Sequence, residues 1–103
     1  MTATFTPLAE EDLKQAYLFY EANDPELAMK FVMAVRQTVD AIEKAPLRFP
    51  VVFESSRRAR VAKFPFVVYY VTDGSSIIIA CLHDRRNPKI VLERLRALAP
   101  SPK

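Results

Sequence analysis

The hydrophobic pattern of this sequence changes its period close to Pro46, and that change most constrains the fold. Before Pro46, apolar residues recur every three or four positions, as they do on one face of an α-helix. After it, β-branched and aromatic residues gather in short runs such as 66–72 and 77–83, which is typical of strands. A chain with helices in its first half and strands in its second is predicted to be an α+β protein, with the helices packed on a sheet.

The first half is predicted to contain a short strand and two helices. Residues 2–6 alternate apolar side chains with threonine, as a short strand does. Thr6-Pro7 has the form of a helix N-cap followed by proline, and the apolar stripe behind it predicts a helix to about Ala22. Asp24-Pro25 repeats this signal for a second helix, which ends at Ala45-Pro46. Because the connection is so short, the two helices should form an antiparallel hairpin.

The second half is predicted to contain three antiparallel strands and a terminal helix. Residues 46–56 have two prolines and no clear period, so they are predicted to be a loop. The first strand is expected at 57–64, and Asp73-Gly74 is a turn signal between the other two. Asn87-Pro88 then starts a short C-terminal helix. The expected fold class is therefore α+β: a short N-terminal strand, a helical hairpin on one face of a mainly antiparallel sheet, and the terminal helix.

The length and composition of the chain limit the number of domains and exclude some classes of protein. Its 103 residues have room for one compact domain, so 1–103 is predicted to be a single domain with a frayed tail from Pro100 to Lys103. The longest apolar runs have six residues, against roughly twenty needed to cross a bilayer, and the N-terminus lacks the regions of a signal peptide. The single cysteine, Cys81, excludes an intrachain disulfide and fits a cytoplasmic location.

The formal net charge of +3 hides an uneven distribution of charge. Residues 1–50 carry five basic and eight acidic side chains, a balance of −3, whereas residues 51–103 carry ten basic and four acidic ones, a balance of +6. Such an asymmetry predicts that the second half binds a polyanion or an acidic protein surface.

One local candidate for such binding is the first predicted strand, which carries four cations and no anion. Side chains alternate along a strand, so Arg58 and Arg60 share one face while Arg57 and Lys63 share the other. Arginine binds phosphate and carboxylate groups bidentately, which favours a row of anion-binding side chains. The alternative is an edge strand that its charges keep soluble.

A second basic group follows the last predicted strand. It consists of His83, Arg85, Arg86 and Lys89. The two arginines lie too close to the strand end to be deeply buried unless they are paired, so they are candidates for ligand contact. Pairing with Asp84 or Glu93 is the competing interpretation.

His83 permits two interpretations. If the strand 77–83 is regular, His83 lies on the face of Ile77, Ile79 and Cys81. A lone histidine at a strand end is more often a hydrogen-bonded structural residue than a catalytic one. Cleavage of RNA through the 2′-hydroxyl needs a base, an acid and cations, however, and His83 is a candidate acid or base in such a reaction.

Other residues bear on the same chemistry. Lys63 is a second candidate for proton transfer if its pKa is depressed, and either Tyr69 or Tyr70 is a candidate for stacking on a base. These tyrosines point to opposite faces of their strand, so only one can face a ligand. With only Gly74 as glycine, a glycine-rich phosphate loop is excluded. One histidine and one cysteine make a metal site improbable, and no cofactor is expected.

Taken in order, these features resemble the RelE/ParE toxins of type II toxin-antitoxin systems. The resemblance is carried by the hairpin with Asp12-Leu13, Tyr20 and 28–31, by Pro46, by the Arg57-Arg58 strand, by Phe64-Pro65-Phe66-Val67-Val68-Tyr69-Tyr70, and by His83-Asp84-Arg85-Arg86-Asn87-Pro88. It extends to about Leu95. It implies a cytoplasmic toxin that a cognate antitoxin neutralises by folding a disordered segment around its basic surface. A homodimer or an antitoxin-bound hetero-oligomer fits the same resemblance.

Two branches of this family differ in their target. RelE-like members cut ribosome-bound mRNA, and in that case Lys63, His83 and Arg85 are the catalytic candidates. Those members usually have a Tyr or His near the C-terminus, and none follows Arg86 here. ParE-like members bind DNA gyrase and stall it without catalysing a reaction, and the His-x-Arg-Arg-x-Pro ending looks more like theirs.

We therefore expect a ParE-like toxin that inhibits gyrase by binding, with residues after Pro88 in contact with gyrase. The expected residues for binding the target or a polyanion are Arg57, Arg58, Arg60, Lys63, Arg85, Arg86 and Lys89. A RelE-like ribosome-dependent endonuclease, or a degenerate member that only binds antitoxin, are the alternatives.

Overall fold

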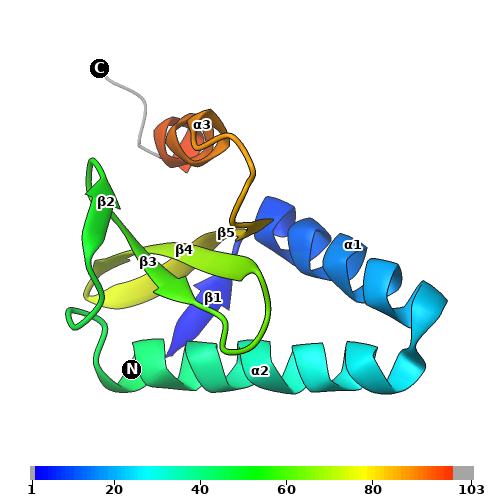
Figure 1. Ribbon diagram of the computed structural model, residues 1–103. Helices are drawn as coiled ribbons and strands as arrows, with labels where there is room; N and C mark the ends of the chain where they lie inside the picture. Colours follow the sequence, from blue (N-terminus) through cyan, green and yellow to red (C-terminus); the bar gives the residue numbers. More distant parts are fainter. Residues whose placement is uncertain (1, 99–103) are drawn as a thin grey trace.

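The computed structural model describes residues 2–98 (Figure 1). Their elements are β1 (Ala3–Phe5), α1 (Pro7–Asn23), α2 (Pro25–Lys44), β2 (Val51–Phe53), β3 (Ser56–Arg60), β4 (Phe66–Asp73), β5 (Ser75–His83) and α3 (Lys89–Leu98). This order confirms the predicted α+β class. The tail predicted at Pro100 to Lys103 lies outside the described residues.

Capping residues end and begin the helices of the hairpin where the sequence predicts. The Thr6 hydroxyl caps the start of α1. Asp24 serves both helices. Its N–H donates to the Tyr20 carbonyl at 2.8 Å at the end of α1. Its carboxylate accepts the N–H groups of Glu26 and Leu27, at 3.1 and 3.2 Å, at the start of α2. One residue therefore satisfies backbone groups of two helices and keeps their connection short.

A five-stranded sheet with the order β1-β5-β4-β3-β2 forms the centre of the fold. β1 runs parallel to β5, and the other pairs are antiparallel. The prediction that 46–56 is only a loop is wrong, because β2 lies within it. Three residues are too few to give a recognisable period, and β2 exists because it pairs with the start of β3.

The strand predicted at 57–64 is too long at its C-terminal end. β3 ends at Arg60, and the Val61 N–H bonds to the Phe66 carbonyl at 3.0 Å across the turn into β4. Lys63 lies in this turn with a φ of 68°, in the left-handed region that a strand residue does not adopt. Lys63 is therefore not part of the row that begins at Arg57.

Helices cover both faces of the sheet (Figure 1). Alternate residues of β4 divide between two apolar clusters. Phe66, Val68 and Tyr70 pack with the helical hairpin. Val67 and Tyr69 pack on the opposite side, where the buried α3 residues are found. The hairpin face was predicted, and α3 supplies a third layer, so that residues 66–70 of β4 are buried while its last three residues are partly or fully exposed.

A bulge in β5 corrects the predicted face of His83. Ile79 is an extra residue in β5, because the register against β4 shifts there. The bulge reverses the alternation of faces along the strand. His83 therefore shares the hairpin side with Cys81, whereas Ile77 and Ile79 pack on the α3 side.

The last described element, α3, begins close to the predicted start signal. The Asn87 Oδ1 atom accepts the Lys89 N–H at 2.9 Å, and Val91 and Leu95 are buried against the sheet. None of the described helices combines the length and the apolar composition that crossing a bilayer requires.

Candidate binding surface

The arginines of β3 divide between the two faces of the sheet as alternation predicts. Arg58 lies opposite Tyr69 and Arg60 lies opposite Val67, so both belong to the face that α3 covers in part. Arg58 is half-buried and Arg60 is exposed. Two guanidinium groups two residues apart on one strand face form a short cationic row beside α3.

Asp84 joins this row to the basic segment after β5. Its N–H donates to the Pro65 carbonyl at 2.9 Å, which holds the loop against the start of β4. Its carboxylate lies 3.2 Å from the Arg60 Nη2 atom and 3.3 Å from the His83 Nδ1 atom. The two basic groups that the sequence separates by more than twenty residues thus meet at one carboxylate.

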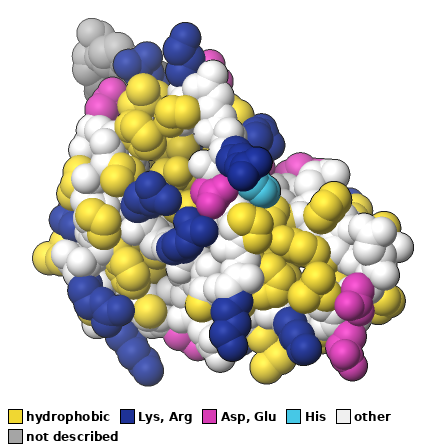
Figure 2. Space-filling view, in the orientation of Figure 1, with side chains coloured by type: hydrophobic (Ala, Val, Ile, Leu, Met, Phe, Trp, Pro, Cys, Tyr) yellow, Lys and Arg dark blue, Asp and Glu magenta, His cyan; other side chains and the backbone are white. Residues whose placement is uncertain are grey.

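Figure 2 shows the result on the molecular surface. Lys and Arg side chains gather in the region between α3 and β3, with one acidic side chain and the histidine among them. Because a single carboxylate serves this group, the surface keeps a net positive charge.

The His83 ring has two neighbours competing for one nitrogen. Its Nδ1 atom accepts the Arg85 N–H at 3.1 Å, which requires an unprotonated Nδ1, and the same atom faces the Asp84 carboxylate at 3.3 Å. The ring also packs edge-to-face on Phe66, with centroids 5.5 Å apart.

Two predicted cations lie apart from this group. Arg57 points to the hairpin side, where its Nη1 atom donates to the carbonyl of Phe49 at 2.7 Å and to that of Leu47 at 3.2 Å. It ties the segment before β2 to the sheet. Lys63 lines a hollow against α2, together with Lys30 and other α2 residues.

The remaining predicted cations surround the loop before α3. Arg85 and Lys89 are exposed, and no ion pair joins either of them to another residue within 2–98. Arg86 lines a cleft between α1 and the end of β5, and His83 lines the same cleft. The three catalytic candidates for RNA cleavage are thus not gathered in one cavity: Lys63 and His83 line different hollows, and Arg85 lines neither.

The two tyrosines of β4 point to opposite faces, as predicted, and both are buried. The Tyr70 hydroxyl donates to the Pro46 carbonyl at 2.5 Å. Burial raises the Tyr70 pKa, and the nearby Arg57 charge opposes that shift. Tyr69 packs against Phe53 on the α3 side, with ring centroids 6.3 Å apart. Neither ring is free to stack on a base.

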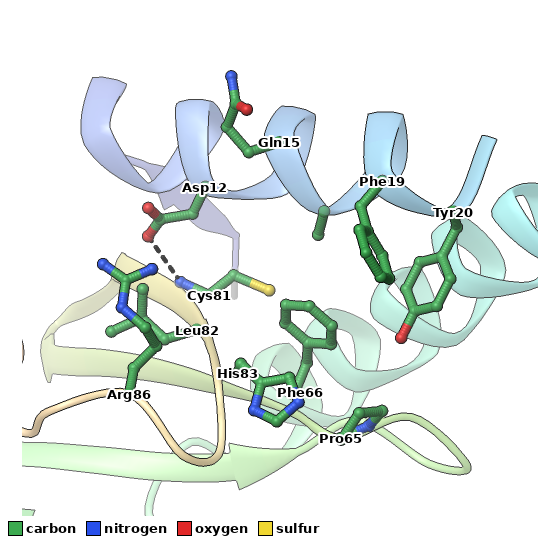
Figure 3. A pocket seen from close by; sticks show the side chains of 11 residues that line it. Asp12, Gln15, Phe19, Tyr20, Pro65, Phe66, Cys81, Leu82, His83 and Arg86 are labelled. Atoms are coloured by element: carbon green, nitrogen blue, oxygen red, sulfur yellow. Dashed lines mark hydrogen bonds between the residues drawn. The ribbon is translucent and has the colours of Figure 1, made fainter. Parts of the chain in front are cut away.

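A largely buried ion pair that the sequence did not single out fixes α3. Asp12 on α1 accepts two hydrogen bonds from the Arg94 guanidinium on α3, one of them at 3.0 Å. Asp12 also accepts the Cys81 N–H at 3.0 Å (Figure 3), and Arg94 donates to the Ile79 carbonyl at 3.1 Å. Two charged residues thereby satisfy the backbone of β5 at its bulge and tie it to α1 and α3.

A signal for this pair was present in the sequence. Asp12 lies three residues after Ala9 and four before Ala16, and both alanines face the sheet. Arg94 lies three residues after the buried Val91 on α3. A carboxylate and a guanidinium that each fall within an apolar helical stripe are candidates for mutual pairing, since an unpaired charge is rarely buried.

Cys81 is an unreactive core residue at this site. Burial, assisted by the Asp12 charge, raises the pKa of its thiol to about 12. Among residues 2–98 no cluster of three or more His, Cys, Asp or Glu side chains has the arrangement of a metal site.

Comparisons with known proteins agree with the geometry. The family model of the ParE toxin of type II toxin-antitoxin system, parDE, matches residues 3–88. A solved structure, the chromosomal ParDE TA system from P. aeruginosa, contains a chain with a TM-score of 0.72 and 22% identity, and the match covers 81% of this chain and 95% of that one. At that identity the structural likeness supports the fold alone. No curated protein matches the chain. The match to the family model covers most of the chain, which therefore belongs to the ParE toxin family of type II toxin-antitoxin systems.

Proposed function

We propose that this ParE-family toxin acts in the cytoplasm by binding DNA gyrase and stalling it, and that a cognate antitoxin neutralises it by covering its basic surface. The surface proposed for gyrase is the cationic row of β3, the exposed cations beside Asp84 and the outer side of α3. The residues are Arg58, Arg60, Arg85 and Lys89.

The observation that carries this proposal is the convergence of Arg58 and Arg60 with the segment 83–86 next to α3. A catalytic mechanism would need its acid, base and cations around one phosphate. Of the candidates for those roles, Lys63 and His83 line separate hollows and Arg85 lines neither of them. An open cationic surface beside an exposed helix suits binding to a large target, because charge at the rim of an interface steers association.

The test is gyrase inhibition by the purified protein. We expect loss of supercoiling activity and accumulation of cleaved plasmid DNA trapped with gyrase. The double variant Arg58→Gln/Arg60→Gln should weaken inhibition at least tenfold. The double variant Lys14→Gln/Arg36→Gln removes two charges from exposed positions of α1 and α2, and it should inhibit like the wild type. Unchanged supercoiling at micromolar wild-type protein would reject the proposal.

One observation favours a second candidate, a ribosome-dependent mRNA endonuclease. The Asp84 carboxylate contacts the Arg60 guanidinium at 3.2 Å and the His83 imidazole at 3.3 Å, so it lies between them. The His83 side chain is partly exposed. An imidazole beside a carboxylate and a cation is a plausible unit for proton transfer at a phosphate. Primer extension on translated mRNA tests it: cuts within codons that His83→Ala abolishes would favour this candidate over gyrase binding.

Growth measurements separate both candidates from a degenerate member that only binds antitoxin. Induction of an active toxin alone should arrest growth, and co-expression of the antitoxin should restore it. Normal growth on induction, together with retained antitoxin binding, would identify a degenerate member.

A further inference from the structure

A cleft with a volume of about 520 Å³ lies between α1 and the end of β5 (Figure 3). The small side chains of Ala9 and Ala16 on α1 are buried, and Ala16 lines the cleft. Farther along, α1 extends beyond the sheet, as Figure 1 shows. Near the end of α1, Tyr20 packs on Phe66 at the start of β4, and Phe19 lies beside Tyr20 on the lining of the cleft.

The lining of this cleft is mainly apolar, and one of its aromatic side chains is strongly exposed. Phe19 is 64% exposed although its ring contacts Tyr20 edge-to-face, with centroids 5.4 Å apart. Tyr20 in turn packs on Phe66 at 6.1 Å. A row of three aromatic rings, open to solvent at one end, offers a receptive surface for another apolar side chain.

Two polar groups at opposite ends of the cleft have no described partner among residues 2–98. The Tyr20 hydroxyl, whose pKa burial raises, points into the cleft in Figure 3 and takes part in none of the described hydrogen bonds. Arg86 forms no described ion pair. The nearby carboxylates have other partners: Asp12 pairs with Arg94, and Asp84 pairs with Arg60 and contacts His83. A carboxylate arriving beside Arg86 would find a guanidinium ready to donate hydrogen bonds, whereas the Tyr20 hydroxyl lies at the other end of the cleft, beyond Phe66 (Figure 3).

We propose that this cleft receives a large apolar side chain of the antitoxin, with a neighbouring antitoxin carboxylate bound by Arg86. The inference deepens the proposed function, since it rests on neutralisation by an antitoxin. The acidic character of the segment follows from charge: Asp12 in the cleft is already paired with Arg94, Arg86 forms no described ion pair, and the adjoining surface has more cations than carboxylates. The aromatic rings of Phe19, Tyr20 and Phe66 favour a large apolar side chain of the antitoxin as the group that enters the cleft.

The chain contains no tryptophan, so Phe19→Trp would place a single reporter at the mouth. We expect the emission of this variant to shift to the blue when purified cognate antitoxin is added, after subtraction of the antitoxin's own emission. Leu18→Trp is the matched control, because Leu18 is exposed on the same helix and does not line the cleft. Its emission should stay unchanged. Equal shifts for both variants, or none for Phe19→Trp, would overturn the inference.

Affinity measurements complete the test. Phe19→Ala should raise the antitoxin dissociation constant at least tenfold, and Arg86→Gln should raise it by a smaller, salt-dependent factor. Leu18→Ala and Lys14→Gln should leave it unchanged. Because these side chains are exposed, the variants should fold, and far-UV circular dichroism verifies that they do. An antitoxin affinity that Phe19→Ala leaves intact would overturn the inference.

Two further readouts identify a wrong occupant. Loss of gyrase inhibition by Phe19→Ala at unchanged antitoxin affinity would assign the cleft to gyrase, and a blue shift that depends on toxin concentration alone would assign it to a second copy. Either result overturns the antitoxin as occupant. The two proposals fail separately: a wild-type protein that leaves gyrase active rejects gyrase binding, while the tryptophan shift still reports on the cleft.

Discussion

Removing the charge of Asp12 should destabilise the fold far more than removing any surface carboxylate. The Asp12 and Arg94 side chains are only 12% and 14% exposed, and their pairing satisfies backbone groups of β5 as well. Breaking a buried pair by removing one partner costs roughly 3–5 kcal/mol, because the other charge stays buried without compensation. Asp12→Asn keeps an oxygen that can accept the Cys81 N–H, so we expect the lower end, about 3 kcal/mol. For a chain of this size that corresponds to a fall in Tm of roughly 12–24 °C.

Urea denaturation followed by circular dichroism measures this loss. The control is Glu54→Gln, which removes the Arg96–Glu54 pair, whose atoms are 3.5 Å apart and whose side chains are 71% and 52% exposed. It should cost at most about 1 kcal/mol, as exposed pairs do. The double variant Asp12→Asn/Arg94→Met removes the stranded charge and should recover part of the loss. If Asp12→Asn cost no more than Glu54→Gln, the reasoning about burial of this pair would be refuted.

Three smaller effects follow from other contacts. The Cys81 thiol, whose pKa burial raises from 9.0 to about 12, keeps its proton in the folded state while the unfolded chain loses it. The free energy of unfolding should therefore fall as pH rises between 9 and 12, by up to about 1.4 kcal/mol per pH unit, and Cys81→Ala should flatten this decline in urea titrations. Tyr70→Phe loses the bond to the Pro46 carbonyl and should cost about 1 kcal/mol in thermal unfolding, whereas Tyr17→Phe, at an exposed position, should cost less. Asp24→Ala removes the cap of α2 and should cost roughly 1–2 kcal/mol, and a change within error would contradict the capping role.

Local chemistry made much of this fold predictable from the sequence. The helix starts at Pro7 and Pro25 depend on neighbouring residues alone, because Thr6 and Asp24 cap the backbone within a few positions of themselves. The central parts of the long strands β4 and β5 are buried, and their β-branched and aromatic residues made these strands predictable.

The errors arose where long-range pairing decides the structure. β2 exists through its partner β3, and three residues leave no period of their own. The bulge at Ile79 is a property of two strands together, so β5 alone gave no sign that His83 and Ile77 lie on opposite sides. The candidate site was likewise predictable where local sequence decides and unpredictable where long-range pairing decides. Its residue types were visible as basic runs, but their meeting at Asp84 depends on the antiparallel return of β5 beside β4.

The end of the family match has a physical counterpart in the fold. The match stops at residue 88, and α3 begins at Lys89, so this helix is the element of the described chain that the family model leaves uncovered. Its position is nevertheless fixed from within the matched region, because Asp12 on α1 holds Arg94. The helix proposed to contact gyrase is therefore anchored by a charge that also satisfies the bulge of β5. A substitution at Asp12 should thus disturb the target surface and the sheet together, whereas one on the outer side of α3 should alter target binding and leave the sheet intact.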